Sequence, residues 1–120
     1  MNENQWVNRL FKTIDGKDTN EFVAFLAPSC VFRFGNMVPV EGKEAIEASV
    51  NAFFESIESL DHKLIDVLDV SGGKVCHGQV LYTRKDGSVL TVPFANILKG
   101  QEQEITEYLI FADTSKLYEY

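Results

Sequence analysis

The second half of the chain carries four strand-like segments in succession, and this feature constrains the fold more than any other. The segments are His62–Val70, Val75–Arg84, Val89–Lys99 and Ile105–Asp113. The turn between the second and third contains Asp86-Gly87, and Asp-Gly is a strong signal for a tight hairpin. Consecutive strands joined by short turns pair antiparallel. The sequence therefore predicts a four-stranded meander.

The first half of the chain shows mostly helical periodicity. Residues 6–14 and 43–59 repeat apolar side chains at three- and four-residue spacing. A shorter helix around Phe22 is expected to close at Pro28, and Cys30–Phe34 alternates as an early strand. Three helices and about five strands predict an α+β domain, with the helices on one face of a curved antiparallel sheet. The length of 120 residues fits one domain over 1–120.

Composition narrows the expected partners and compartment. The net charge of −7 argues against non-specific binding of nucleic acid or of anionic membranes, because both need a basic surface. No segment approaches the ~18 apolar residues of a membrane span, and the N-terminus lacks a signal-peptide pattern, so we expect cytoplasmic residence. Cys30 and Cys76 are then expected to be reduced thiols. Metal-ligand spacing and cofactor motifs do not stand out, so we expect neither a metal nor a cofactor.

Short motifs follow one another along almost the whole chain, and their order resembles the SnoaL-like branch of the nuclear transport factor 2-like superfamily. Relatives in that superfamily include ketosteroid isomerase, limonene epoxide hydrolase and polyketide cyclases. The motifs are Ile14-Asp15-Gly16-Lys17-Asp18, Phe22-x-x-Phe25-Leu26-Ala27-Pro28, Val31-Phe32-Arg33-Phe34-Gly35-Asn36, Gly42-Lys43-Glu44-Ala45-Ile46, Gly78-x-Val80-x-Tyr82, Pro93-Phe94-x-Asn96 and Ile105-x-x-Tyr108-x-Ile110-x-x-Asp113. The resemblance implies a cone-shaped sheet wrapped around the helices, an internal cavity, and dimers that pack through the sheet.

The catalytic groups of two such relatives do not carry over. Ketosteroid isomerase needs two aspartates and a tyrosine, and limonene epoxide hydrolase needs an arginine and two aspartates around a water. In this sequence the two aspartates of ketosteroid isomerase correspond to Phe34 and Ala95, and its tyrosine corresponds to Leu10. The positions used by limonene epoxide hydrolase fall near Gly78, Val80 and Ile110. None of these side chains can move a proton, so the resemblance implies that both known mechanisms are missing.

Strand alternation, aligned on the resemblance, predicts which residues line the cavity. The pocket is expected to be apolar and aromatic, and to suit a small, flat, hydrophobic molecule. Asn36, at a strand end, is a further ligand-binding candidate, although turn geometry alone explains an Asn there. The other predicted lining residues are Phe32, Phe34, Val80, Tyr82, Ala95, Ile97, Tyr108 and Ile110 from strands, and Trp6, Leu10, Ser49 and Phe53 from helices.

Three residues are candidates for catalysis. His62 is placed by alternation on the same face as Leu64 and Leu68, and histidine is the commonest general base. Tyr82 and Tyr108 are candidates to donate hydrogen bonds to a substrate carbonyl. The structural alternatives remain open: a strand-edge histidine bonded to backbone or water, and two tyrosines that only fill the core.

The outer face of the sheet is expected to pair two copies of the chain. Phe94, Asn96 and Leu98 on one strand, with Leu109 and Phe111 on the next, would otherwise expose an apolar patch. Two functions stay open. The first is a cofactor-free isomerase, cyclase or hydrolase acting on a hydrophobic metabolite. The second is a non-catalytic carrier, sensor or dimerisation module, since function resides in sites and not in folds.

Overall fold

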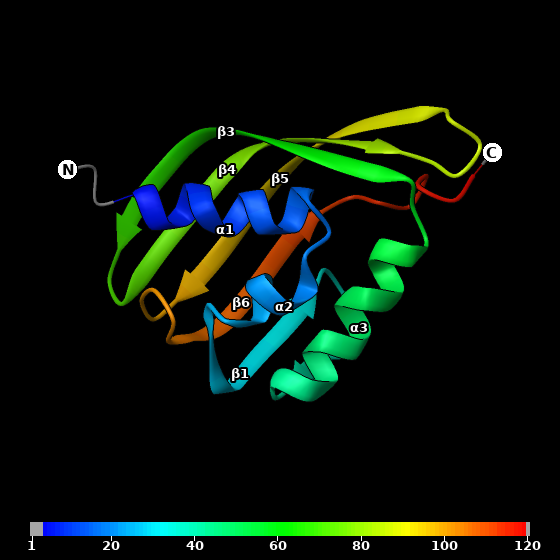
Figure 1. Cartoon of the computed structure of the whole chain (residues 1–120). Coiled ribbons are helices and arrows are strands. Elements are labelled where there is room, and N and C mark those ends of the chain that lie inside the picture. The colour runs from blue at the N-terminus through cyan, green and yellow to red at the C-terminus, as the bar shows by residue number, and fades with distance from the viewer. Residues whose placement is uncertain (1–3, 120) are drawn as a thin grey trace.

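A computed structural model describes residues 4–119 and shows three helices and one curled, unclosed sheet (Figure 1). The helices lie on the concave face of the sheet (Figure 1). This arrangement confirms the predicted α+β cone. The elements are α1 (Gln5–Asp15), α2 (Thr19–Val23), β1 (Leu26–Phe34), β2 (Val40–Glu41), α3 (Lys43–Glu55), β3 (Ser59–Val70), β4 (Gly73–Thr83), β5 (Val89–Lys99) and β6 (Ile105–Ala112).

The sheet has six strands in the order β2-β1-β6-β5-β4-β3. The predicted meander β3 to β6 is present and antiparallel, whereas β1 pairs with β6 in parallel. The sixth strand is the short β2, which pairs Val40 with Phe32 and Glu41 with Val31. Two residues between Pro39 and Gly42 are too few to show alternation, so the sequence pattern does not predict this strand.

The strand β1 begins earlier than predicted. Pro28 was expected to close the second helix, but α2 ends at Val23 and Pro28 lies within β1. The register of β1 with β6 is irregular between Leu26 and Val31. Proline has no N–H to donate, so it is tolerated in a strand at such a break in the ladder.

A bulge in β3 changes which side chains face inward. The register of β3 with β4 shifts between Leu64 and Asp66, which makes Ile65 the extra residue. Leu64 stays inward, whereas Leu68 is 53% exposed, so the predicted placement of Leu68 on the inner face is wrong. Gly78 pairs with Leu64 at this point, and a Cβ there would lie 2.0 Å from the Lys63 carbonyl oxygen.

The helices pack against the concave face from two flanks. The helix α1 contacts β3, while α3 contacts β1 and β2 (Figure 1). Each buries one apolar face: Val7, Leu10, Phe11 and Ile14 from α1, and Ile46, Val50 and Phe54 from α3. The Asp18 side chain accepts a hydrogen bond from the Glu21 backbone N–H and caps α2, as its sequence position suggests.

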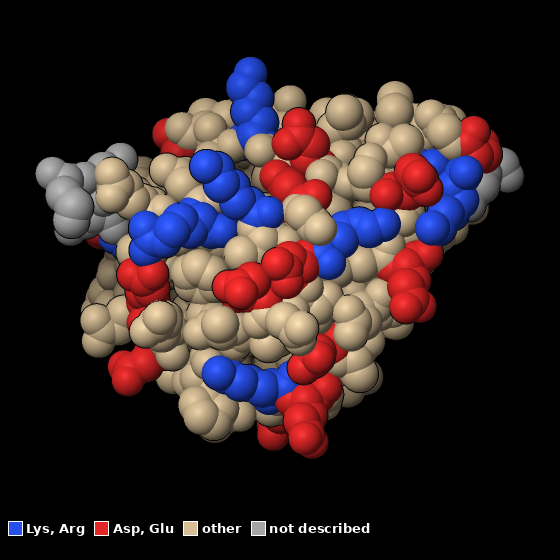
Figure 2. Space-filling view, viewed as in Figure 1, with Lys and Arg blue, Asp and Glu red and all other residues tan. Residues whose placement is uncertain are grey.

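Acidic and basic side chains are interspersed over the helical face of the molecule (Figure 2). Neither sign gathers into one continuous patch on this side (Figure 2). Over residues 4–119, no helix is long and apolar enough to cross a membrane.

Candidate ligand-binding and acid–base site

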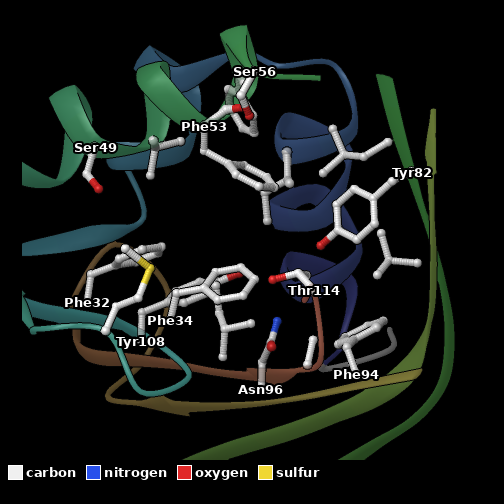
Figure 3. A pocket seen from close by; sticks show the side chains of 18 of the residues that line it. Phe32, Phe34, Ser49, Phe53, Ser56, Tyr82, Phe94, Asn96, Tyr108 and Thr114 are labelled. Carbon is white, nitrogen blue, oxygen red and sulfur yellow. The ribbon is translucent and has the colours of Figure 1, made fainter. Parts of the chain in front are cut away.

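A cavity of about 430 Å³ lies between the concave face of the sheet, α3 and the C-terminal segment (Figure 3). Its wall is largely aromatic, with six phenylalanines: Phe22, Phe32, Phe34, Phe53, Phe54 and Phe94. No Asp, Glu, Lys or Arg of the described chain lines it. Among the described residues, His62 is the only histidine that lines it, and histidine is the commonest general base.

Asp15, at the end of α1, holds His62 in a fixed orientation. The His62 Nδ1 atom lies 2.6 Å from Asp15 Oδ1, and the His62 backbone N–H donates to Asp15 Oδ2 at 2.9 Å. The imidazole also packs against Phe11 and Phe94, with ring centroids 5.0 and 5.1 Å away. The His62 side chain is only 9% exposed. These contacts leave the ring little freedom to turn.

This geometry is that of a general base with an orienting partner. A carboxylate at Nδ1 favours the neutral tautomer that is protonated there, which leaves the lone pair on Nε2. Because Asp15 engages Nδ1 and His62 lines the cavity, Nε2 is the ring nitrogen left to interact with a bound molecule. His62 can therefore accept a proton at Nε2 while Asp15 stabilises the imidazolium that forms.

Tyr82 provides a neutral hydroxyl on the β4 side of the cavity. Its ring packs edge-on against Phe53, with centroids 6.0 Å apart, and its hydroxyl points into the cavity (Figure 3). Burial raises the pKa of Tyr82 above its ordinary range, and the neighbouring Tyr118 adds to the rise. The hydroxyl therefore stays protonated and can donate a hydrogen bond to a ligand oxygen.

Tyr108 and Asn96 form a second polar group, on β6 and β5. The Tyr108 ring stacks on Phe32 at 5.5 Å and meets Phe22 edge-on at 5.4 Å. Burial raises the pKa of Tyr108 well above its ordinary value, and the nearby Asn96 amide partly opposes that rise. Nonetheless, the Tyr108 hydroxyl and Asn96 Oδ1 have no hydrogen-bond partner of ordinary geometry among residues 4–119.

Most of the residues predicted to line the cavity do so. They are Phe32, Phe34, Ser49, Phe53, His62, Val80, Tyr82, Tyr108 and Ile110. Two helical residues do not: Leu10 is fully buried in the core, and Trp6 stacks on Phe25 at 6.5 Å. Of α1, only Ile14 reaches the cavity, because α1 lies beside β3 at one flank.

The predicted orientation of β5 is wrong by one residue. Phe94, Asn96 and Leu98 are 3%, 3% and 1% exposed and face inward, so Ala95 and Ile97 point to the outer face. The strand is apolar on both faces, and alternation alone cannot choose between its two phases. Asn96 was consequently missed as a cavity residue, although it stands beside Phe94 in the recognised motif.

Asn36 lies outside this cavity. It is exposed in the turn after Gly35 and borders a second hollow of about 420 Å³, shared with Arg33 and Asp113. The strand β1 ends at Phe34, before the chain reaches Asn36. Its predicted place among the cavity-lining ligand contacts is therefore wrong.

Asp15 was also missed as a functional residue. An Asp at a helix end is ordinarily explained as a terminator, and 47 residues separate it from His62. The only available signal was its position in the recognised motif Ile14-Asp15-Gly16-Lys17-Asp18.

The C-terminal segment crosses one side of the cavity and is tied to it at two points. Arg84 donates to the carbonyl oxygens of Leu117 at 2.9 Å and Lys116 at 3.0 Å. At the other point the Tyr118 hydroxyl lies 2.6 Å from Ser56 Oγ, beyond the end of α3. Thr114 and Tyr118 line the cavity, and the Thr114 hydroxyl points into it (Figure 3).

Both cysteines are free and fully buried. Burial raises the pKa of Cys30 to about 11 and that of Cys76 to about 12. His77 is exposed on the outer face, where it pairs with Asp66 at 3.2 Å. Within the described part of the chain, no group of three or more His, Cys, Asp or Glu side chains is arranged to hold a metal ion.

A family model described as a SnoaL-like domain matches residues 7–108. This chain belongs to the SnoaL-like family. The resemblance drawn from its motifs is thereby confirmed. No curated protein matches the chain.

Solved structures share the fold of this SnoaL-like protein at low sequence identity. A nuclear transport factor 2-like protein of unknown function from Burkholderia pseudomallei has a TM-score of 0.85 at 16% identity, over 98% of this chain and 95% of that one. A protein of a Jannaschia species, described as a SnoaL-like polyketide cyclase, has a TM-score of 0.81 at 19% identity, over 96% and 88%. TerC, co-crystallised with polyporic acid, has a TM-score of 0.82 at 12% identity, over 98% and 95%. At these identities the likeness establishes the fold alone.

Proposed function

We propose that this SnoaL-like protein binds a small, largely apolar molecule in the cavity and moves a proton on it without a cofactor. The main support for this proposal is the Asp15–His62 pair, because His62 lines an aromatic cavity of about 430 Å³. The reaction class is an isomerisation, cyclisation or hydrolysis that starts with proton removal. TerC, which shares this fold, was co-crystallised with polyporic acid, and this supports the idea that the fold can hold an organic molecule. The proposed setting is the cytoplasm.

Each residue has a distinct role in the proposed reaction. His62 Nε2 takes the proton from the bound molecule, and Asp15 keeps the ring oriented through Nδ1. As negative charge develops on a substrate oxygen, the Tyr82 hydroxyl donates a hydrogen bond to it. The phenylalanine wall makes the surroundings of these groups apolar, which strengthens their electrostatic interactions.

A generic base reaction tests this proposal without knowledge of the natural substrate. In 5-nitrobenzisoxazole, removal of the C3 proton breaks the N–O bond and releases a coloured cyanophenolate. We expect the protein to accelerate this opening, and His62→Gln to lower kcat/KM by about 100-fold or more. His77→Gln is the matched control, because His77 is exposed on the outer face. An equal rate in His62→Gln would contradict the assigned base.

A non-catalytic carrier or sensor is the second candidate. The observation that favours it is the apolar character of Leu10 and Phe34, which stand at two catalytic positions of ketosteroid isomerase relatives. Under this alternative the probe binds in the cavity, competes with other aromatic molecules and does not react faster than in buffer. Turnover that depends on His62 would exclude it.

A further inference from the structure

Asn96 and Tyr108 form a polar pair in an otherwise apolar wall. The two residues are 3% and 1% exposed, and among residues 4–119 neither Asn96 Oδ1 nor the Tyr108 hydroxyl makes a hydrogen bond of ordinary geometry. The Asn96 amide lies close enough to Tyr108 to oppose the rise in its pKa, but Asn96 Oδ1 remains unpaired. Burying a polar group without a partner costs free energy, and folded proteins seldom do so. Contacts within the described chain therefore leave the hydrogen-bonding capacity of this pair incompletely used.

The pair lies within reach of the proposed base. Asn96 and Tyr108 are diagonal neighbours on adjacent strands, since Asn96 pairs with Ile110 and Tyr108 with Leu98. The amide nitrogen of Asn96 points into the cavity (Figure 3). Phe94, two residues before Asn96 on the same face of β5, contacts His62. A molecule that covers Phe94 would therefore reach both His62 and Asn96.

The residues that line the cavity also limit the charge of a molecule that can bind there. Apart from His62, whose ring is already paired with Asp15, the cavity's polar groups are a neutral amide and neutral hydroxyls, such as those of Asn96, Tyr82 and Thr114. The described chain places no Lys or Arg there. A buried carboxylate or phosphate would lack a compensating charge, which is costly in an apolar site. A neutral oxygen needs only a hydrogen-bond donor, and the Asn96 amide nitrogen is one.

We propose that Asn96 binds the carbonyl oxygen of an uncharged aromatic substrate and that Tyr108 positions the Asn96 amide. Asn96 Nδ2–H donates to the substrate oxygen. A small rotation of the amide lets the Tyr108 hydroxyl donate to Asn96 Oδ1. Binding of one ligand therefore gives both side chains a hydrogen-bond partner. This inference rests on the proposed function, because it names the class of molecule that the same cavity takes.

Two aromatic probes of equal shape test the proposed subsite. In 2-isopropenylnaphthalene a CH₂ group replaces the carbonyl oxygen of 2-acetylnaphthalene. By fluorescence titration we expect wild-type protein to bind the ketone roughly tenfold more tightly than the alkene, and also more tightly than 2-naphthoate. In Asn96→Leu the preference for the ketone should disappear while the alkene still binds. Tyr108→Phe should reduce the preference by about threefold and retain the ring stacking.

Three controls separate a binding role from a structural one. Asn8→Leu, on the exposed face of α1, should keep the full preference. The ligand-free Asn96→Leu and Tyr108→Phe proteins should unfold at temperatures no lower than the wild type, because each removes an unpartnered buried group. His62→Gln should keep the preference for the ketone, because this residue acts on the proton and does not hold the oxygen.

The outcomes distinguish this inference from the proposed function. Equal binding of the ketone and the alkene by wild-type protein, or an unchanged preference in Asn96→Leu, would overturn the Asn96 subsite and leave proton transfer by His62 intact. If His62→Gln loses 5-nitrobenzisoxazole turnover and changes nothing else, the result supports both the Asn96 subsite and proton transfer by His62. If neither naphthalene compound binds the wild-type protein, both proposals fail together.

Discussion

At the residue scale, the proposed proton transfer depends on two side chains that contact each other, Asp15 and His62. Asp15 uses both carboxylate oxygens on His62, one on the ring and one on the backbone. This double contact fixes the backbone of β3 at His62 and the direction of the imidazole together. The same imidazole in an apolar wall without a partner would be free to change tautomer.

Asp15→Asn tests the orienting role of the carboxylate. The amide cannot stabilise an imidazolium, and it permits the tautomer protonated at Nε2, which cannot accept a proton there. We expect kcat/KM for 5-nitrobenzisoxazole to fall by about 100-fold or more, with KM changed little. Asp61→Asn, exposed on the same strand next to His62, is the control and should react like wild type. Full activity in Asp15→Asn would remove Asp15 from the site.

The two buried thiols predict a stability change at alkaline pH. Burial raises the pKa of Cys30 and Cys76 from 9.0 to about 11 and about 12. Protonated thiols therefore stabilise the folded state fully below pH 9.0, and this contribution is lost as the pH rises toward the folded pKa values. Urea titrations should show the free energy of unfolding falling between pH 9 and 11.

Alkylation gives the matching chemical measurement. At pH 8 iodoacetamide should label neither cysteine in the native protein and both in urea, because the thiolate is the reactive form. Rapid labelling of either cysteine in the native state would contradict their burial.

Single residues also show where the sequence is informative. The inward orientation of His62 followed from strand alternation, but its partner did not, because Asp15 lies on another element and helix termination already accounts for an Asp there. Tyr82 and Tyr108 could be placed for the same reason as His62. The place of Asn96 in the cavity could not be predicted, because the side-chain pattern of β5 does not show which alternate residues face inward.

At the scale of elements, the C-terminal segment after β6 closes the cavity against β4 and α3. Arg84→Gln should weaken the hydrogen bonds to the Lys116 and Leu117 carbonyls. We expect a loss of about 1 kcal/mol in stability, since the guanidinium is partly exposed, together with faster hydrogen exchange over residues 114–119. Lys85→Gln, in the same turn and exposed, should change neither quantity. Unchanged exchange in Arg84→Gln would show that Leu117 packing alone holds the segment.

Most elements could be predicted because their periodicity is strong, and the errors have physical causes. β5 carries apolar side chains on both faces, so a one-residue shift in phase keeps an apolar inner face. The bulge at Ile65 has no local signature beyond Gly78 on the partner strand, where the two backbones approach closely. β2 is too short to show a pattern. Proline commonly follows the end of a helix, so Pro28 suggested a helix end although it lies within β1.

At the scale of the whole molecule, the outer face of the sheet carries a continuous apolar strip. Leu68, Val75, Ile97 and Leu109 share one register across β3, β4, β5 and β6. Phe111, 51% exposed, extends the strip beside Ala95. The inward Phe94, Asn96 and Leu98 play no part in this face, contrary to the expectation from sequence. We propose that a second copy of the chain covers the strip by presenting the same strip.

Sedimentation velocity at micromolar concentration tests this pairing. Wild-type protein should sediment as a dimer, and Ile97→Asp should sediment as a monomer because it places a charge at the centre of the strip. Val89→Asp, on an exposed residue of the β4–β5 hairpin, should remain dimeric. A monomeric wild-type protein would contradict the proposed interface.

We propose that the fixed His62 imidazole presents Nε2 to a ligand in the cavity. Imidazole ¹H–¹⁵N correlation spectra measure this directly, and His77→Gln assigns the signals because the chain has two histidines. We expect neutral His62 to be protonated at Nδ1, and 2-acetylnaphthalene to shift the Nε2 resonance. A tautomer protonated at Nε2, or an Nε2 signal unchanged when the probe saturates the protein, would contradict it.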